Sequence, residues 1–294
     1  MSEKIPVAII NWDSIEIVEL CINYLHERTD SSRISIHVVD NGSEDRINLK
    51  RLIQLKESGK IDRIIALPKN MGFSIAFNIA FEETVGDIFC YVSSDCLVEP
   101  GWLDEGIKCL QSDERIAAVC SNIFDDKHRE VEKEDRDLTQ LYGAVMFVRR
   151  KAWSDIGCFD YRIFSPAYSE ELDWSYRAIR KGYRIVLAGN SLAYHNESYT
   201  MKKKYEKSEI HLIRLTHRIR CRLINWPVRE LVFSWKWYLL ESLDDIRDKT
   251  IQLLPLAFMK NFLQIPMLLR ERKRRFSKEA VEFNFSYNDT AVFL

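Results

Sequence analysis

The sequence predicts a mixed α/β protein with a mostly parallel sheet, followed by a helical extension. Short apolar runs that suit buried strands alternate with segments whose apolar residues recur at helical spacing, through the first hundred residues. Beyond about residue 200 the strand-like runs cease, and a helical pattern continues to about Phe276. We therefore divide the chain into an α/β domain over residues 1–200 and a basic, aromatic-rich helical extension over residues 201–294.

The β–α alternation can be followed element by element. Residues 7–10 form a continuous apolar run, which is typical of a strand covered on both faces. The helix that follows has Asp13 or Ser14 available as its N-cap. Helices and strands then alternate, with helices expected at 15–27, 49–58 and 73–84 and strands at 34–39, 61–67 and 88–92. Such an order predicts a parallel sheet with helices on both faces.

The second part of the α/β domain continues less regularly. We expect helices at 102–111 and 171–181 and strands at 116–121, 142–148 and 183–188. Residues 125–137 carry alternating charges without an apolar period, which predicts a solvated loop. A mobile loop beside a functional site is the alternative for this segment.

Composition indicates an ordinary globular protein of 294 residues, of which 46% are hydrophobic and 30% charged. The seven cysteines are scattered and include no CxxC pair, which favours reduced thiols in the cytoplasm. The most apolar stretch, residues 251–269, is interrupted by prolines, a lysine and an asparagine. We expect it to form helices that lie on a surface rather than a membrane span. The N-terminus has no leader-like pattern, so we expect a cytoplasmic protein, either soluble or peripheral at the inner face of the membrane.

Charge is unevenly distributed, with a net charge of −9 over residues 1–200 and +10 over residues 201–280. The basic runs 202–204 and 270–275 fit attachment to an anionic membrane, with Trp235, Trp237 and Tyr238 at headgroup level. Alternatively, the helices pack on the first domain or on a second copy, as a homo-oligomer. No nucleic-acid recognition motif accompanies the basic tail, so we expect no nucleic-acid partner.

Polar residues follow each of the first four predicted strands. Ligands of parallel sheets bind at the carboxyl ends of the strands, so these residues should converge on one crevice. The chain has neither GxGxxG after the first strand nor GxxxxGK[ST], which argues against a dinucleotide-binding Rossmann site and a P-loop. The candidate ligand-binding residues are Asn11, Trp12, Asp40, Asn41, Asn70, Gly72, Ser94 and Asp95.

Two aspartates among these residues provide the main evidence for a ligand-binding site. Asp40 is placed to accept hydrogen bonds from a ribose or a base, or else only to cap its own turn. Asp95 is placed to hold a divalent cation that bridges phosphates, because Mg²⁺ usually takes one or two protein carboxylates. A turn-capping role is the alternative for Asp95 as well.

The densest acidic cluster, Glu170, Glu171 and Asp173, opens a predicted helix. Mutual repulsion should raise the pKa of at least one of these carboxyls, and a carboxylate of raised pKa is a suitable general base. Favourable electrostatics at a helix N-terminus is the alternative explanation. His195 follows the last predicted strand, where a single histidine indicates little by itself.

In their order and spacing these segments resemble the family 2 glycosyltransferases, from about Ile5 to His195. The resemblance rests on an ordered set of segments, namely residues 7–12, 38–45, 70–73 with Asn78, 94–95 with 100–103, 142–144, 149–150, 157–160, 170–173 with Arg177, 182–183 and His195. The subgroup that the chain most resembles contains rhamnosyl- and galactofuranosyltransferase-like enzymes that build bacterial surface polysaccharide.

The resemblance implies a GT-A fold, a Rossmann-like nucleotide-sugar domain, and it implies roles for particular residues. Asp40 would bind the uracil or thymine and its ribose, and Asn78 would belong to the donor-binding residues. Asp95 and His195 would hold Mn²⁺ or Mg²⁺ on the diphosphate. Glu171 would deprotonate the acceptor hydroxyl in an inverting transfer from a UDP- or dTDP-sugar to a glycan or lipid-linked glycan. The chain departs from the family pattern at Ser93 and Ser94, which leave Asp95 as the single acid of the metal motif.

A second departure is that the base is usually an aspartate, so Glu170 remains an alternative to Glu171. Cys158 also stands where glycine is common. The alternative function is a catalytically inactive nucleotide-binding or scaffold module of the same fold.

Overall fold

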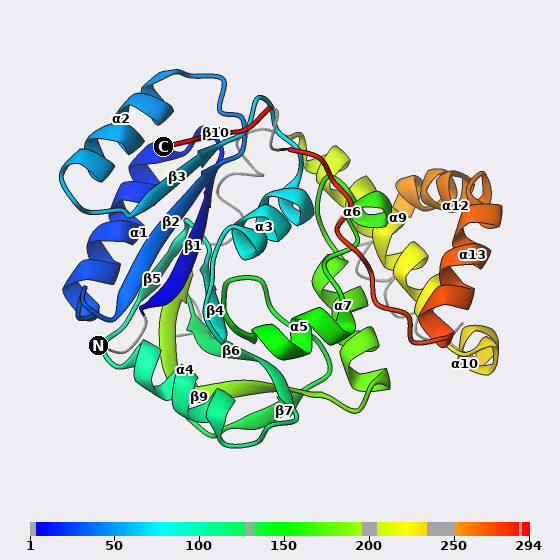
Figure 1. Cartoon of the computed structure of the whole chain (residues 1–294). Helices are drawn as coiled ribbons and strands as arrows, with labels where there is room; N and C mark the ends of the chain where they lie inside the picture. The colour runs from blue at the N-terminus through cyan, green and yellow to red at the C-terminus, as the bar shows by residue number, and fades with distance from the viewer. Residues whose placement is uncertain (1–3, 127–130, 132, 196–204, 234–250, 288–289) are drawn as a thin grey trace.

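The computed structural model describes residues 4–126, 131, 133–195, 205–233, 251–287 and 290–294. One sheet of ten strands runs through the α/β part, and helices lie against both of its faces (Figure 1). The strands are β1 (Ile5–Asn11), β2 (Ile34–Asp40), β3 (Arg63–Ala66), β4 (Ile88–Val92), β5 (Cys96–Val98), β6 (Ile116–Phe124), β7 (Arg136–Leu138), β8 (Val145–Arg149), β9 (Arg184–His195) and β10 (Val292–Phe293).

The sheet confirms the predicted mixed α/β class. Its order is β10-β3-β2-β1-β4-β8-β6-β9-β5, with β7 paired to β9. Strands β3, β2, β1 and β4 are parallel, as the β–α alternation predicts, whereas β8 is antiparallel to both of its neighbours, β4 and β6. The four parallel strands therefore place their carboxyl ends along one edge.

Helices on the two faces bury separate apolar clusters. On one face α1 (Ile15–Arg28), α2 (Ile47–Glu57) and α4 (Trp102–Gln111) cover the sheet, and Trp102 is fully buried there. On the other face lie α3 (Phe73–Glu82), α5 (Arg150–Ile156) and α7 (Glu170–Arg180), with Phe77 and Trp174 fully buried. Between α5 and α7 along the chain lies the short α6 (Tyr161–Phe164).

Strand β9 differs most from its prediction, because it continues to His195 instead of ending near residue 188. The ladder between β6 and β9 is shifted between Ser121 and Asn122, and pairing resumes at Leu192. The end of β9 then pairs with β5, a three-residue strand too short to give a periodic signal. Strand β6 likewise extends to Phe124, and β7 begins at the end of the expected loop, of which residues 127–130 and 132 lie outside the described chain.

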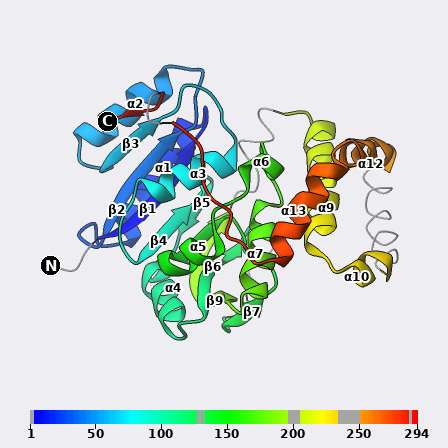
Figure 2. The same cartoon turned by 45° about the vertical axis from the view of Figure 1, so that its right-hand side comes forward.

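The helical extension packs beside α6 and α7 (Figures 1 and 2). Its described helices are α9 (Lys207–Asn225), α10 (Val228–Phe233), the 3₁₀ helix η1 (Ile251–Leu253), α12 (Leu254–Phe262) and α13 (Ile265–Phe276). After α13 the chain returns across the α/β part, and β10 pairs with β3. The division at residue 200 stays a prediction. The basic run 202–204 and Trp235, Trp237 and Tyr238 lie outside the described residues.

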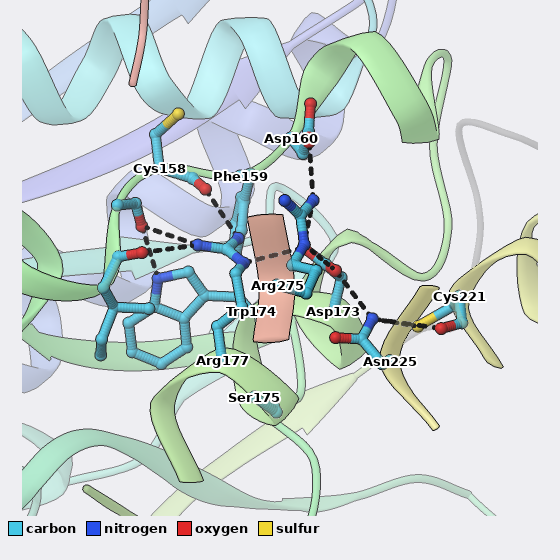
Figure 3. A network of polar contacts seen from close by, with 12 residues as sticks. Cys158, Phe159, Asp160, Asp173, Trp174, Ser175, Arg177, Cys221, Asn225 and Arg275 are labelled. Atoms are coloured by element: carbon cyan, nitrogen blue, oxygen red, sulfur yellow. Dashed lines mark hydrogen bonds and ion pairs between the residues drawn. The ribbon is translucent and has the colours of Figure 1, made fainter. Parts of the chain in front are cut away.

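A buried ion network joins α13 to α7 (Figure 3). The Arg275 guanidinium donates to Asp173 Oδ1 over 2.9 Å and to Asp160 Oδ2 over 2.7 Å. Arg177 Nε donates to Asp173 Oδ2 over 2.9 Å, and Asn225 Nδ2 of α9 donates to Asp173 Oδ1 over 2.8 Å. Both Arg275 and Asp173 are almost wholly buried. Two helices of the extension are thus fastened to one carboxylate of the α/β part.

Electrostatics keeps Asp173 ionised in this network. Burial alone would raise its pKa, but the positive charges of Arg275 and Arg177 outweigh burial and lower the pKa to about 2. Unfolded aspartate has a pKa of about 3.9. The lowered pKa therefore contributes stability that is complete above about pH 4 and is lost as the pH falls towards 2.

We expect Asp173→Asn to lower the free energy of unfolding by about 3–5 kcal/mol, because it leaves two buried guanidinium groups without their shared carboxylate. Urea denaturation at pH 7 measures the change. Asp155→Asn is the matched control, since Asp155 pairs with Lys181 over 2.9 Å with half of its side chain exposed. We expect that control to lose less than about 1 kcal/mol, and equal losses in the two variants would contradict the network's role.

Candidate active site

A cleft of about 650 Å³ opens near the carboxyl ends of β1 and β4. Trp12, Asn41, Asn70, Gly72, Ser94 and Asp95 line it from the first four strands. Glu170 and Glu171 at the start of α7 and His195 at the end of β9 line it as well. Nine of the predicted site residues therefore share one cleft, although they come from six separate segments of the chain.

Asn11 and Asp40 lie behind the cleft wall, at the adjacent ends of β1 and β2. Asn11 Nδ2 donates to Asp40 Oδ1 over 2.8 Å, and the Ser43 hydroxyl donates to the same oxygen. Burial raises the pKa of Asp40, while these two hydrogen bonds act in the opposite direction. Asp40 is 4% exposed and accepts hydrogen bonds from Ser43 in its own turn, so the turn-capping contacts given as the alternative for Asp40 are present.

The turn after β2 is held tightly against the turn after β3. Gly42 has a φ of +67°, and a Cβ there would lie 2.0 Å from the Lys69 carbonyl carbon, so only glycine fits. Asn41 Oδ1 accepts from the Met71 amide over 2.9 Å, and Asn41 Nδ2 donates to Asn70 Oδ1 over 3.2 Å. These contacts fix the floor of the cleft.

Two further predicted residues do not line the cleft. Asn78 lies on α3, where Nδ2 donates to the Phe159 carbonyl over 2.9 Å and Oδ1 accepts from the Phe159 amide over 3.2 Å. It thereby joins α3 to the segment before α6. Asp173 is turned into the ion network described above, because it lies two residues beyond Glu171 on α7 and points away from the cleft.

Strand pairing brings Asp95 and His195 together from positions one hundred residues apart. Cys96 is opposite His195 in the β5–β9 ladder, so Asp95 lies beside His195 at the end of the pair. His195 Nε2 is 3.3 Å from Asp95 Oδ1, and Ser93 Oγ donates to the same oxygen over 2.6 Å. The imidazole is one-fifth exposed, so it faces both Asp95 and the cleft.

This pair fits a divalent cation held by few protein ligands. The ligand atoms of Asp95, Cys96 and His195 all lie within 4.8 Å of one another. Burial, reinforced by the Asp95 charge, raises the pKa of the Cys96 thiol well above its usual range, so the sulfur keeps its proton. A carboxylate and an imidazole beside an open cleft leave room for water and phosphate oxygens, which suits Mn²⁺ or Mg²⁺.

Glu170 and Glu171 line the same cleft from the start of α7. Burial raises the pKa of Glu171 to about 7. Burial and then repulsion by Glu171 raise the pKa of Glu170 well above its usual range, and Glu170 Oε2 has no hydrogen-bond partner among the described residues. The sequence predicts that mutual repulsion raises the pKa of at least one of these carboxyls, whereas burial is the larger cause of the raised pKa of both Glu170 and Glu171. A Cβ on Gly143 would lie 2.4 Å from Glu171 Oε1, so that glycine makes room for the carboxylate.

Some residues that line the cleft are not predicted from the sequence. Tyr168 has a φ of +75°, a conformation that its residue type does not indicate. Arg136 belongs to the segment expected as a charged loop, and Tyr205 belongs to the extension, with its ring centre 6.0 Å from that of Trp12. Motif order could not place them, because each approaches the cleft through tertiary packing.

Comparisons with known proteins agree with this architecture. A family model described as "Glycosyl transferase family 2" matches residues 7–174, which is more than half of the chain. The chain is 24% identical over 208 residues to "Glycosyltransferase AglE" of Haloferax volcanii, an alignment that covers 65% of this chain and 66% of that protein.

Solved structures share the fold at low identity. GalNAc-T7 with UDP, GalNAc and Mn²⁺ superposes with a TM-score of 0.63 at 14% identity, over 79% of this chain and 49% of that one. S. aureus TarS 1-349 with UDP-GlcNAc gives 0.58 at 17% identity, over 76% and 67% of the two chains. The mannosyltransferase PcManGT from Pyrobaculum calidifontis with GDP-Man and Mn²⁺ gives 0.58 at 13% identity, over 93% and 74%.

The chain spans about half of the GalNAc-T7 chain and just under two thirds of Glycosyltransferase AglE of Haloferax volcanii. The fold of all three structures is the GT-A type that the sequence predicts. On the match over residues 7–174, this chain belongs to glycosyl transferase family 2.

Proposed function

We propose that the protein transfers a sugar from a UDP- or dTDP-sugar to a hydroxyl group of a glycan or lipid-linked glycan, with inversion at the anomeric carbon. The observation that carries the proposal is the shared cleft, which the Asp95–His195 pair and the Glu170–Glu171 carboxyls both line. A site for a diphosphate and a site for a base would thus share one cavity. Similar folds hold UDP, UDP-GlcNAc or GDP-Man, which supports a nucleotide-sugar donor.

The donor would lie along the ends of β1, β2 and β4. Trp12, Asn41 and Asn70 would offer a ring and amide groups to the base and ribose, with Asp40 held by Asn11 behind them. Asp95 and His195 would hold Mn²⁺ or Mg²⁺ against the diphosphate. A bound cation of this kind supplies positive charge that stabilises the departing diphosphate.

Glu171 would supply the base. As the bond from the acceptor oxygen to the anomeric carbon forms, the bond from that carbon to the diphosphate oxygen breaks, and the hydroxyl proton passes to the Glu171 carboxylate. A carboxyl with a pKa of about 7 is half ionised near neutrality and is a stronger base than an ordinary glutamate. Glu170, whose pKa is raised well above its usual range by burial and by repulsion from Glu171, would keep its proton and donate a hydrogen bond within the cleft.

The acceptor and the cellular setting belong to the same proposal. By its resemblance to that subgroup, the chain would be a rhamnosyl- or galactofuranosyltransferase-like enzyme of surface polysaccharide synthesis, acting in the cytoplasm at the inner face of the membrane. The alternative is an inactive nucleotide-binding module, which the single acid of the segment Ser93-Ser94-Asp95 favours.

The donor site is tested by thermal unfolding with UDP, dTDP, GDP or ADP, each with and without Mn²⁺. A nucleotide that binds only the folded chain stabilises it by about 2.7 kcal/mol at a hundredfold excess over the dissociation constant. We expect a metal-dependent rise with UDP or dTDP, and we expect Asp95→Ala to lose it. Asp137→Ala, on the exposed edge strand β7, is the control and should keep the rise. No rise with any nucleotide would contradict the donor site.

The base is tested by exchanging each glutamate of the pair for glutamine. Glu171→Gln should lower kcat by about 10²–10⁴-fold, because the amide cannot accept the proton. Glu170→Gln should retain kcat within about tenfold, because the amide imitates a carboxyl that keeps its proton. Release of nucleoside diphosphate from the donor identified above measures both. The reverse order of the two losses would assign the base to Glu170, and nucleotide binding without turnover in the unaltered chain would establish the inactive module.

A further inference from the structure

Helices α12 and α13 bury polar side chains and expose apolar ones. Their inner stripe contains Asn261, Glu271 and Arg275, which are 2%, 7% and 1% exposed. Asn261 Oδ1 accepts from Arg220 Nε over 3.1 Å, and Asn261 Nδ2 donates to the Thr216 carbonyl over 3.0 Å. The two helices therefore pack on α9 and α7 through hydrogen bonds and ion pairs as well as apolar contacts, the reverse of an ordinary surface helix.

The outer face of this pair is apolar. Phe262 and Leu263 are 71% and 72% exposed, Leu269 is 62% exposed, and Phe258 and Met259 are about half exposed. Three of the five, Phe258, Met259 and Phe262, lie on α12 at spacings of one, three and four residues, which places them on one side of the helix, and Leu263 directly follows as its C-cap. We call these five residues the apolar α12–α13 face. A cluster of this kind on a protein in water marks a surface that another partner covers.

The charges around the apolar α12–α13 face indicate which kind of partner covers it. Residues 251–276 contain six lysines and arginines and a single acid, Glu271, whose carboxylate lies 3.4 Å from Arg275. Lys260, Arg270 and Lys273 are exposed on the same two helices. Apolar side chains surrounded by cations match the interface of a bilayer that contains anionic lipids. A second copy of the chain would instead bring like charges together.

The bend between α12 and α13 argues against a straight membrane-spanning helix. Among the described residues, no single helix is long and apolar enough to cross a membrane. The segments Ile251–Phe262 and Ile265–Phe276 meet such a criterion only together, and they are bent by 75° between them. Because Arg275 also fixes the end of α13 inside the protein, the pair is held by the fold and cannot straighten without breaking the buried ion network.

We infer that the apolar α12–α13 face docks the protein on an anionic lipid surface, with Phe262 and Leu263 inserted at the headgroup boundary. The inference does not depend on the proposed sugar transfer. It does add a location for a lipid-linked acceptor, since the same helices that carry the face are joined through Asp173 to the helix that carries Glu171.

Co-sedimentation of the full chain with vesicles tests the inference, using phosphatidylcholine alone and phosphatidylcholine mixed with phosphatidylglycerol. We expect binding to the mixed vesicles that weakens with added salt, and a loss of about tenfold or more in Phe262→Glu/Leu263→Glu. The matched control is Leu20→Glu/Val85→Glu, which adds the same charges at side chains that are 45% and 74% exposed elsewhere. That control should bind as the unaltered chain does.

Thermal unfolding and the nucleotide response of both double variants separate lost docking from lost folding or a lost donor site. Absence of binding to mixed vesicles by the unaltered chain would overturn the inference. Equal binding by the two double variants would overturn the assignment to this face. A lipid-independent dimer that Phe262→Glu/Leu263→Glu dissociates, together with no vesicle binding, would identify a second copy as the occupant instead.

Discussion

The buried pairing of Arg275 with Asp173 is the interaction on which the arrangement of the two parts depends. It fastens α13 to α7, and through Asn225 it also holds α9 against the same carboxylate. Helix α7 begins with Glu170 and Glu171, so the helical extension supports the helix that forms one wall of the cleft. An intact buried ion pair contributes little net stability, but removal of one partner lowers the free energy of unfolding strongly. A shift of α13 along α7 would separate the partners, so the ion pair favours one register of these helices.

Three acids within one helical turn acquire different properties from their surroundings. Asp173 faces two guanidinium groups and stays ionised, whereas Glu170 and Glu171 face a cleft with no cation on their carboxylates among the described ion pairs. Burial then raises the pKa of both glutamates. The part of the cleft around Asp95 is built by backbone pairing instead, because the β5–β9 ladder sets Asp95 beside His195. One part of the cleft thus depends on side-chain charge and the other on strand register.

The sequence predicts the parallel strands and the convergence of their ends, because strand-like segments alternate with helical ones and each strand is followed by polar residues. It also selects Asp95, Glu171 and His195, which share the cleft. It does not predict the orientation of Asn78 or Asp173. Motif spacing fixes the position of a residue along a helix, but only packing against Phe159 or Arg275 decides where its side chain points. Strand β5 is not predicted because three residues are too few to give a periodic signal. The end of β9 is not predicted because it follows a register shift in the β6–β9 ladder.

In the proposed reaction, a carboxyl of raised pKa serves as the base in this cleft. The most direct test is kcat against pH for release of nucleoside diphosphate, at saturating nucleotide sugar and Mn²⁺. Because the ionised form of Glu171 would be the active one, and its pKa is raised to about 7, kcat should fall about tenfold per pH unit below about pH 6 and level off above about pH 8. A rate that is constant between pH 5 and pH 8, with the chain still folded, would contradict the assignment.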